Sequence, residues 1–266
     1  MLLIPGLKIL RVFLGVFITT IGAQATFAEP ISIATTSGGK ISAIADFPVG
    51  DGKHPAIVLA PGQGYHMTLP AMESTAKALV EQGIAVFRFN WTYFSAEPKG
   101  QPSEDLSKEL QDLLAVLAAA RKHPRVLAQS LSVGGKSLGS LVAWRAFASD
   151  QQLRSALLLT PVCSRVPKGE TKPKPEAKDN YAGFDSERRP SLWISGDKDP
   201  LCAAAVMYAF AATSPGAARV AIVGGDHGYE NRQLPQAAAE VASKRNITAV
   251  SVLASSFVAE TFSIQP

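Results

Sequence analysis

A short glycine-flanked serine motif is the first place in this sequence where chemistry is expected. Gly135-Lys136-Ser137-Leu138-Gly139 follows one apolar run and precedes another, "LGSLVAWRAFAS". A serine on a sharp turn from strand to helix presents its hydroxyl clear of the chain, and the next amide points to where an oxyanion would form. The motif therefore predicts Ser137 as a nucleophile and the amide of Leu138 as an oxyanion donor.

The same residues contain Gly-Lys-Ser, which also occurs in phosphate-binding loops. Those loops require another glycine five positions before the glycine of Gly-Lys-Ser. That position is occupied by Ser130, so the sequence does not predict a phosphate loop. Lys136, directly before the predicted nucleophile, is expected to lie along the surface; the alternative is that it steadies an acidic group of a substrate.

A serine nucleophile needs a general base, and the chain has four histidines. His54 and His123 precede expected strands, which places them at the far end of a parallel sheet from Ser137. His66 and His227 follow expected strands and belong at the same end as Ser137. His227 lies in the glycine-rich stretch "VGGDHGYE", which suits a tight loop, and is the predicted base; His66 lies close to the expected oxyanion loop.

The base needs an acid to orient it, and two aspartates follow the strand in "SLWISGDKDPLC". Asp199 is the predicted acid, and Asp197 is the alternative. Asp199 also precedes Pro200, as an N-cap residue with proline at the first helical position would. The order serine, aspartate, histidine along the chain is that of α/β-hydrolases and differs from the two main serine-protease folds.

Apolar runs and turn residues divide the chain into alternating strands and helices. The helix after residue 103 is expected to have Ser103 as its N-cap, and a polar loop is expected over 164–189. Strands are expected at residues 31–36, 41–47, 55–60, 84–91, 130–135, 155–160, 191–195 and 219–223, and helices at 70–82, 103–120, 138–149, 201–212 and 234–262.

The middle strands are continuously apolar, which is typical of a parallel sheet covered by helices on both faces. The sequence therefore predicts an α/β protein with three layers. In such sheets the ligand site lies at the carboxyl ends of the strands. The predicted nucleophile, acid and base all follow strands and meet at that edge.

The first 28 residues have the order of a secretory signal peptide. Lys8 and Arg11 are followed by the apolar run "VFLGVFITTIG" and by small residues, with cleavage expected after Ala25 or Ala28. The apolar run is shorter than the roughly 20 residues of a membrane span. Cleavage after Ala28 lowers the formal charge from +4 to +2. We expect one domain over 29–266, secreted or periplasmic, with no nucleic-acid partner and no stable membrane span.

Four segments in this order resemble the α/β-hydrolase superfamily, specifically its small, lid-poor, dienelactone-hydrolase-like branch. The resemblance covers about residues 54–228, with a helical tail. It implies a Ser-His-Asp triad of Ser137, His227 and Asp199, oxyanion amides at Gln63 and Leu138, a minimal lid, and no cofactor or metal. The segments are "VLAPGQGYHMTLPAMESTAKALVEQGIAVFRFNW", "GGKSLGSLVA", "WISGDKDPLC" and "VGGDHGYE".

Two further expectations concern the surroundings of the triad. In the strand order that the resemblance implies, the strands before Cys163 and Cys202 are neighbours, which favours a disulfide in an oxidising compartment; two free buried thiols are the alternative. Aromatic residues after the strand ends favour an apolar substrate pocket, with ordinary packing as the alternative. They are Tyr65, His66, Trp91, Tyr93 and Phe94.

The function expected from the resemblance is a serine hydrolase that acts on a small carboxylic ester through an acyl-enzyme. A catalytically silent binding protein on the same fold is the alternative, because superfamily members can lose activity. An acyltransferase or a peptidase with the same triad is a further alternative. Oligomeric state and natural substrate do not follow from these residues.

Overall fold

Eight strands form one sheet in the computed structural model of the chain, which describes residues 27–35, 38–167, 169–172, 174–216 and 218–263. The spatial order is β1-β2-β4-β3-β5-β6-β9-β10, and β2 is antiparallel to both of its neighbours while the other pairs are parallel. The strands are β1 (Phe27–Ala34), β2 (Lys40–Phe47), β3 (His54–Ala60), β4 (Ala85–Phe89), β5 (Val126–Lys136), β6 (Ala156–Leu159), β9 (Ser191–Gly196) and β10 (Ala218–Val223).

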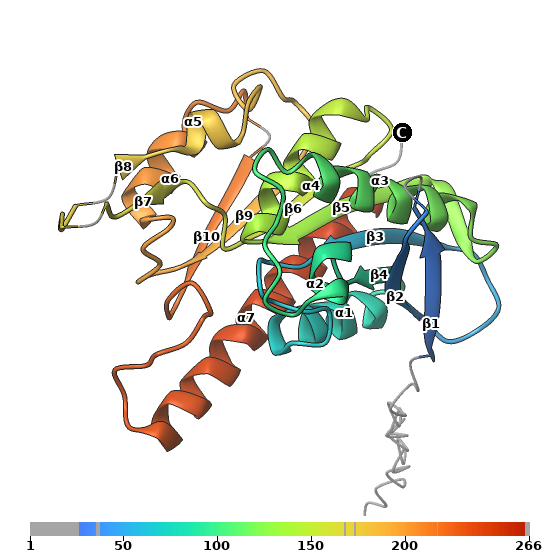
Figure 1. Cartoon of the computed structure of the whole chain (residues 1–266), viewed down its shortest axis with the longest axis horizontal. Coiled ribbons are helices and arrows are strands. Elements are labelled where there is room, and N and C mark those ends of the chain that lie inside the picture. Colours follow the sequence, from blue (N-terminus) through green and yellow to red (C-terminus); the bar gives the residue numbers. More distant parts are fainter. Residues whose placement is uncertain (1–26, 36–37, 168, 173, 217, 264–266) are drawn as a thin grey trace, which may run out of the picture.

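Helices cover both faces of this sheet, as the unbroken apolar strands predict. On one face α1 (Pro70–Glu81) packs beside α7 (Gln236–Ser263), and on the other α3 (Ser107–Lys122) packs beside α4 (Leu138–Ser149) (Figure 1). Two separate clusters of buried apolar side chains lie in the two layers between helices and sheet. The fold is therefore the predicted three-layer α/β architecture of the α/β-hydrolase type.

Several element boundaries differ from those expected. The helix expected from Ser103 begins at Ser107 instead, because Leu106 adopts a left-handed conformation with φ of 57°. The hydroxyl of Ser103 donates to Glu109 and accepts from the N–H of Lys108. The expected N-cap residue thus forms a turn before the helix. Two short helices, α2 (Thr92–Ala96) and α6 (Ala204–Ala211), follow strands at the carboxyl edge.

The expected polar loop has structure of its own. It contains β7 (Ser164–Arg165), β8 (Lys174–Pro175) and α5 (Ala177–Asn180). Tyr181 and Phe184 are buried within it, with the Tyr181 ring 4.5 Å from that of Trp193 and the Phe184 ring 4.2 Å from that of Phe210. These aromatic contacts anchor the segment to the sheet and to α6.

The expected signal peptide lies almost wholly outside the described residues, since the description starts at Phe27. Phe27 and Ala28 already belong to β1, where they pair with Phe47 and Asp46 of β2. Across the described ranges, none of the helices is both long enough and apolar enough for a transmembrane segment.

Candidate active site

Ser137 occupies the turn between β5 and α4, at the carboxyl edge of the sheet. Its backbone angles, φ of 53° and ψ of −120°, lie in a region that residues other than glycine rarely adopt. The flanking glycines permit this turn: a Cβ at Gly135 would lie 2.2 Å from the carbonyl oxygen of Gly139, and one at Gly139 would lie 2.4 Å from that of Ala60. The two glycines of the motif are therefore required by close backbone packing around a strained serine.

The side chain of His227 connects Ser137 to a buried carboxylate. His227 lies on the loop between β10 and α7, and its Nε2 is 2.8 Å from the Ser137 Oγ. Its Nδ1 is 2.9 Å from both carboxylate oxygens of Asp199. A carboxylate only accepts hydrogen bonds, so Nδ1 carries the proton and Nε2 is free to accept one from the serine hydroxyl. This geometry suits removal of a proton from Ser137.

Asp199, and not the alternative Asp197, contacts the imidazole. The side chain of Asp199 is fully buried and also accepts hydrogen bonds from the Ser195 hydroxyl at 3.0 Å and the Leu201 N–H at 2.8 Å. Asp197 accepts instead from the N–H of Gly225, 2.7 Å away, at the start of the histidine loop. Asp199 therefore contacts the imidazole, whereas Asp197 holds the start of the loop that carries it.

The histidine loop is held by residues that the sequence reasoning missed. Tyr229 is fully buried with φ of 62°, and its hydroxyl donates to the Ile194 carbonyl and accepts from the Thr160 N–H. Its own carbonyl accepts from the Asn246 side chain of α7 at 3.1 Å. The sequence places this tyrosine two residues after the predicted base, but that its side chain points into the core could be seen only from the fold.

Lys136 corrects an expectation, because it is buried and does not lie along the surface. Only 3% of its surface is exposed. Its Nζ donates to the Thr160 Oγ1 at 3.2 Å and the His227 carbonyl at 3.0 Å, and lies 4.7 Å from the centre of the Tyr65 ring. Burial lowers the pKa of Lys136 to about 8, with Asp199 the strongest of the nearby charges that oppose the change.

The two residues predicted to supply oxyanion amides lie next to the serine turn, Leu138 along the chain and Gln63 through its neighbour Gly62. Leu138 is the first residue of α4, so its N–H has no intrahelical acceptor and stands at the positive end of the helix dipole. Gln63 follows Gly62, where an added Cβ would lie 3.3 Å from the Ser137 Cβ. The side chain of Gln63 points to Gln101, to which it donates at 2.7 Å.

Trp91, expected in the substrate pocket, is in the core instead. It is 1% exposed, and its ring packs against Phe89 with centroids 4.8 Å apart. Its indole N–H donates to the Pro61 carbonyl at 2.9 Å, on the loop that carries Gln63. Trp91 thus supports the predicted oxyanion loop: β4 ends at Phe89, two residues earlier than expected, and Trp91 lies at the N-terminus of α2 with its ring in the core.

The remaining aromatic residues of the expected pocket are half-buried around this loop. The Tyr65 hydroxyl accepts from the Ala71 N–H at the start of α1, which places its ring between α1 and Lys136. His66 bonds to Thr68, and its ring lies 6.1 Å from that of Phe94. Burial, and then the charge of Glu109, raise the pKa of Tyr93 to about 12. His66 and Phe94 therefore form a half-buried pair of rings beside this loop.

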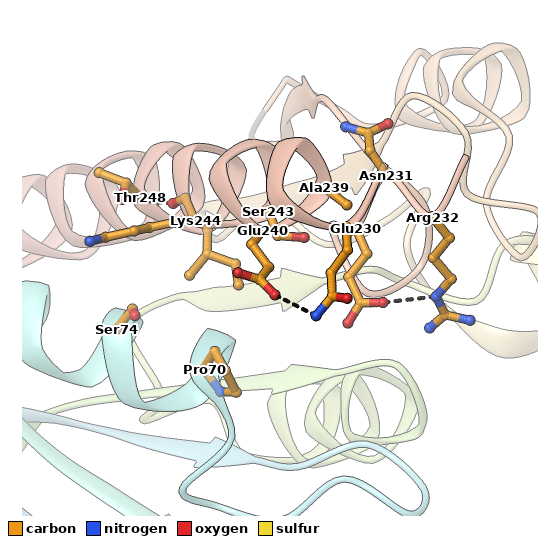
Figure 2. A pocket seen from close by; sticks show the side chains of 12 residues that line it. Pro70, Ser74, Glu230, Asn231, Arg232, Ala239, Glu240, Ser243, Lys244 and Thr248 are labelled. Carbon is orange, nitrogen blue, oxygen red and sulfur yellow. Dashed lines mark hydrogen bonds and ion pairs between the residues drawn. The ribbon is translucent and has the colours of Figure 1, made fainter. Parts of the chain in front are cut away.

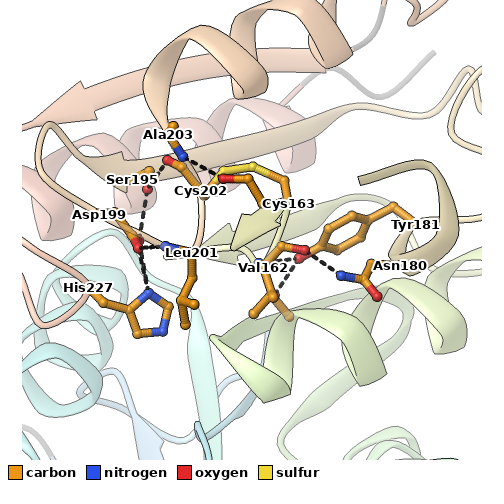
Figure 3. Close-up of a disulfide and its surroundings, with 12 residues drawn as sticks. Val162, Cys163, Asn180, Tyr181, Ser195, Asp199, Leu201, Cys202, Ala203 and His227 are labelled. Carbon is orange, nitrogen blue, oxygen red and sulfur yellow. Dashed lines mark hydrogen bonds and ion pairs between the residues drawn. A yellow bond between two sulfur atoms is a disulfide. The ribbon is translucent and has the colours of Figure 1, made fainter. Parts of the chain in front are cut away.

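A disulfide joins Cys163 and Cys202 directly behind the acid (Figure 3). The Leu201 carbonyl between Asp199 and the disulfide accepts hydrogen bonds from the N–H groups of Cys163 and Ser164, at 2.9 and 2.7 Å. The loop that carries Asp199 is therefore tied to the segment after β6 by one covalent bond and two main-chain hydrogen bonds.

A cavity of about 490 Å³ opens beside the histidine loop, between α1 and α7 (Figure 2). Glu230 and Arg232 form an ion pair at 2.8 Å on its rim. Among the described residues, no cluster of three or more His, Cys, Asp or Glu side chains suits a metal ion. The lining residues are Pro70, Ser74, Glu230, Asn231, Arg232, Gln236, Ala239, Glu240, Ser243, Lys244, Ile247 and Thr248.

Comparison with protein families matches residues 53–259 to a family model described as an alpha/beta hydrolase domain. A search of curated proteins found no match.

Solved structures of the same fold include Est1E from Butyrivibrio proteoclasticus, which has 17% sequence identity and a TM-score of 0.66 over 88% of this chain and 99% of that one. An alpha-beta serine hydrolase homologue from Coxiella burnetii has 19% identity and a TM-score of 0.63, over 85% and 96% of the two chains. XC6422 from Xanthomonas campestris, described as a serine hydrolase without lid, has 19% identity and a TM-score of 0.62, over 90% and 97%. These similarities concern the fold.

Proposed function

Because this chain belongs to the alpha/beta hydrolase family, we propose that it is a serine hydrolase that cleaves carboxylic esters. The observation that carries the proposal is the unbroken series of hydrogen bonds from Ser137 through His227 to Asp199. A serine held at φ of 53° supports it further, since backbone strain of this kind is retained where a function requires it.

In the proposed mechanism His227 Nε2 takes the hydroxyl proton as the Ser137 Oγ attacks the ester carbonyl carbon. The carbonyl oxygen becomes an oxyanion, which the N–H groups of Leu138 and Gln63 stabilise. The tetrahedral intermediate collapses as His227 gives the proton to the leaving alcohol, which leaves an ester between the acyl group and Ser137. Water, deprotonated by His227, then attacks this ester and releases the acid and the free serine.

Asp199 contributes by fixing the tautomer and the direction of the imidazole. Its carboxylate accepts the Nδ1 proton and stabilises the imidazolium that forms when Nε2 is protonated. The carboxylate stays in place because Ser195 and Leu201 also donate to it.

The half-buried rings of His66 and Phe94 lead us to propose esters with a flat or apolar acyl group. A solved structure of Est1E has ferulic acid bound, so aryl-acyl esters belong among the substrates tested.

A panel of p-nitrophenyl esters of increasing chain length, together with methyl ferulate, tests this function on the mature protein. We expect turnover of at least one ester and its loss in Ser137→Ala. A Ser137→Ala variant with undiminished hydrolysis would show that another group performs the reaction. Hydrolysis of no ester, with no labelling by a fluorophosphonate, would favour the silent binding protein.

We also propose that the chain is exported and that its leader is cleaved after Ala25. Cleavage there leaves β1 complete, whereas cleavage after Ala28 would remove its first two residues and their pairing with Phe47 and Asp46. The disulfide between Cys163 and Cys202 is compatible with an oxidising compartment. N-terminal sequencing of the exported protein decides between the sites: a first residue of Thr26 supports the proposal, and a first residue of Glu29 contradicts it.

A further inference from the structure

Lys136 is a buried cation that the proposed mechanism does not use. Its ammonium has three neighbours: the Thr160 hydroxyl, the His227 carbonyl and the face of the Tyr65 ring. Among the described residues, no carboxylate oxygen comes within 4.0 Å of it. Burying a charge without a directly paired countercharge costs stability, and a lysine in such a place points to a role beyond packing.

The three neighbours of this ammonium belong to three different segments of the site. His227 is on the histidine loop between β10 and α7, Thr160 directly follows β6, and Tyr65 is on the predicted oxyanion loop. Lys136 itself directly precedes Ser137 on β5. One side chain therefore joins the residue before the nucleophile to the main chain of the base. The carbonyl it holds belongs to the same residue whose imidazole contacts the Ser137 Oγ at 2.8 Å.

We propose that Lys136 is a positioning residue whose ammonium fixes the main chain of His227, and thereby keeps the imidazole aligned with Ser137. This inference rests on the proposed function for its kinetic consequences. Lys136 acts through His227 and does not touch the substrate, since it is 3% exposed.

The protonation state of Lys136 follows from its surroundings and gives the inference a signature. Burial lowers the pKa of Lys136 to about 8. The charges that face it are Asp199, after β9, and Asp226 and Glu230, on the histidine loop. A charged donor makes hydrogen bonds roughly twice as strong as those of a neutral one. Above this pH the neutral amine holds His227 more weakly, so the turnover rate declines.

The test compares Lys136→Met, which removes the ammonium at similar length, with Lys198→Met as the matched control. Lys198 is exposed at the same edge and donates to Asn231 at 3.3 Å, without a contact to the base. We expect Lys136→Met to lower kcat by roughly 10- to 100-fold while KM changes by less than about twofold, because alignment of the base affects the chemical step. The control keeps the kcat and the alkaline decline of the unmodified protein.

The pH profile separates this positioning role from a merely structural one. We expect kcat of the unmodified protein to fall with a midpoint at a pH of about 8, and we expect that decline to be absent in Lys136→Met. An unchanged kcat in Lys136→Met, or an alkaline decline that persists there, would overturn the inference. Thr160→Val is a second variant in case Lys136→Met misfolds, because it removes the other hydrogen-bond acceptor of the ammonium at nearly constant side-chain shape. We expect it to lower kcat less than Lys136→Met does. A kcat and a pH profile identical to those of the unmodified protein would count against the inference.

A spectroscopic readout keeps this test separate from the fate of the proposed function. The downfield proton resonance of the His227 Nδ1–H, bonded to Asp199, reports the alignment of the ring whether or not an ester is cleaved. We expect it to sharpen below and broaden above a pH of about 8 in the unmodified protein, and to stay broad in Lys136→Met. A resonance equally sharp in both proteins would reject the positioning role even if no substrate were found.

Discussion

The two ends of the sheet carry the same kinds of residue and use them differently. At the carboxyl end His227 lies between the Ser137 hydroxyl and the Asp199 carboxylate, with hydrogen bonds on both ring nitrogens. At the amino end His123 also lies near a carboxylate, with Glu29 4.0 Å from its Nε2. Of these two histidines, the first alone has an imidazole aligned with a hydroxyl group.

The surroundings of His123 explain this difference. Its ring stacks on Phe47 at 4.8 Å and meets Phe87 edge-on at 5.8 Å. Its Nδ1 accepts a hydrogen bond from the main-chain N–H of Arg125, so this nitrogen carries no proton. Burial lowers the pKa of His123, which disfavours the charged form. The amino-end histidine packs as an aromatic ring that closes the core.

The alignment of a histidine with a hydroxyl group depends more on where strands and helices end than on which residue types lie nearby. At the carboxyl end the strand-to-helix turn of Ser137 places a hydroxyl beside free amides at the start of α4. At the amino end the chain returns from α3 to β5, and its polar groups are used in turns. Both ends hold histidine and acid, but the strained serine lies at the carboxyl end.

The largest expected effect comes from exchanging each histidine for glutamine. His227→Gln should lower kcat/KM for an ester by roughly 10⁴-fold, because no base remains to take the serine proton. His123→Gln should change it by less than about twofold and lower the free energy of unfolding by about 1 kcal/mol, since only packing is lost. Steady-state kinetics with urea unfolding measure both. Similar losses of activity in the two variants would abolish the contrast between the ends.

The next effect separates the two aspartates of the carboxyl end. Asp199→Asn should lower kcat by roughly 10³- to 10⁴-fold, because an amide no longer fixes the imidazole tautomer. Asp197→Asn should lower it by less than about tenfold, because the amide oxygen can still accept from Gly225. A reversed order of the two kcat values would assign the acid to Asp197.

The disulfide behind the acid loop should dominate stability at this end. Cys163 and Cys202 are 39 residues apart, and cross-linking that length stabilises the native state by roughly 4 kcal/mol in the chain-entropy model. Replacing both cysteines by alanine should therefore lower the free energy of unfolding by about that amount in urea titrations. A loss below about 1 kcal/mol would mean that the main-chain bonds to Leu201 suffice.

The smallest of these effects is the pH dependence that Lys136 adds to stability. Burial holds its pKa at about 8, below the ordinary value of 10.5, so the folded state loses this proton before the unfolded state does. The cost of burying the charge is complete below a pH of about 8 and disappears as pH rises to about 10.5. Over that interval the unmodified protein should gain roughly 3 kcal/mol relative to Lys136→Met. If the difference in the free energy of unfolding between the two proteins does not vary with pH, the ammonium is exposed to water.

Much of the fold and the serine motif follow from local sequence. Continuous apolar strands and amphipathic helices predict the three layers, because burial on both faces of a parallel sheet leaves that pattern. The two glycines around Ser137 predict the strained turn, which the structure confirms with its φ of 53°. The three triad side chains meet as the topology predicts, while their catalytic roles are still a proposal.

The parts that could not be predicted depend on side-chain direction across segments far apart in the chain. Lys136 looks like a surface residue in sequence, and it is buried because the end of β6 and the histidine loop fold over it. Trp91 looks like a pocket residue, and it points inward to bond Pro61. Tyr229 supports the base through a contact with Ile194 that is 35 residues distant. No local periodicity contains these contacts.

The most direct test of the proposed triad is covalent labelling of the mature protein with a fluorophosphonate, followed by mass spectrometry of its peptides. We predict a single adduct on Ser137, formed quickly in the unmodified protein and in His123→Gln, and very slowly in His227→Gln. An adduct on a different residue, or labelling that is equally fast in both histidine variants, would contradict the claim that Ser137, His227 and Asp199 act together.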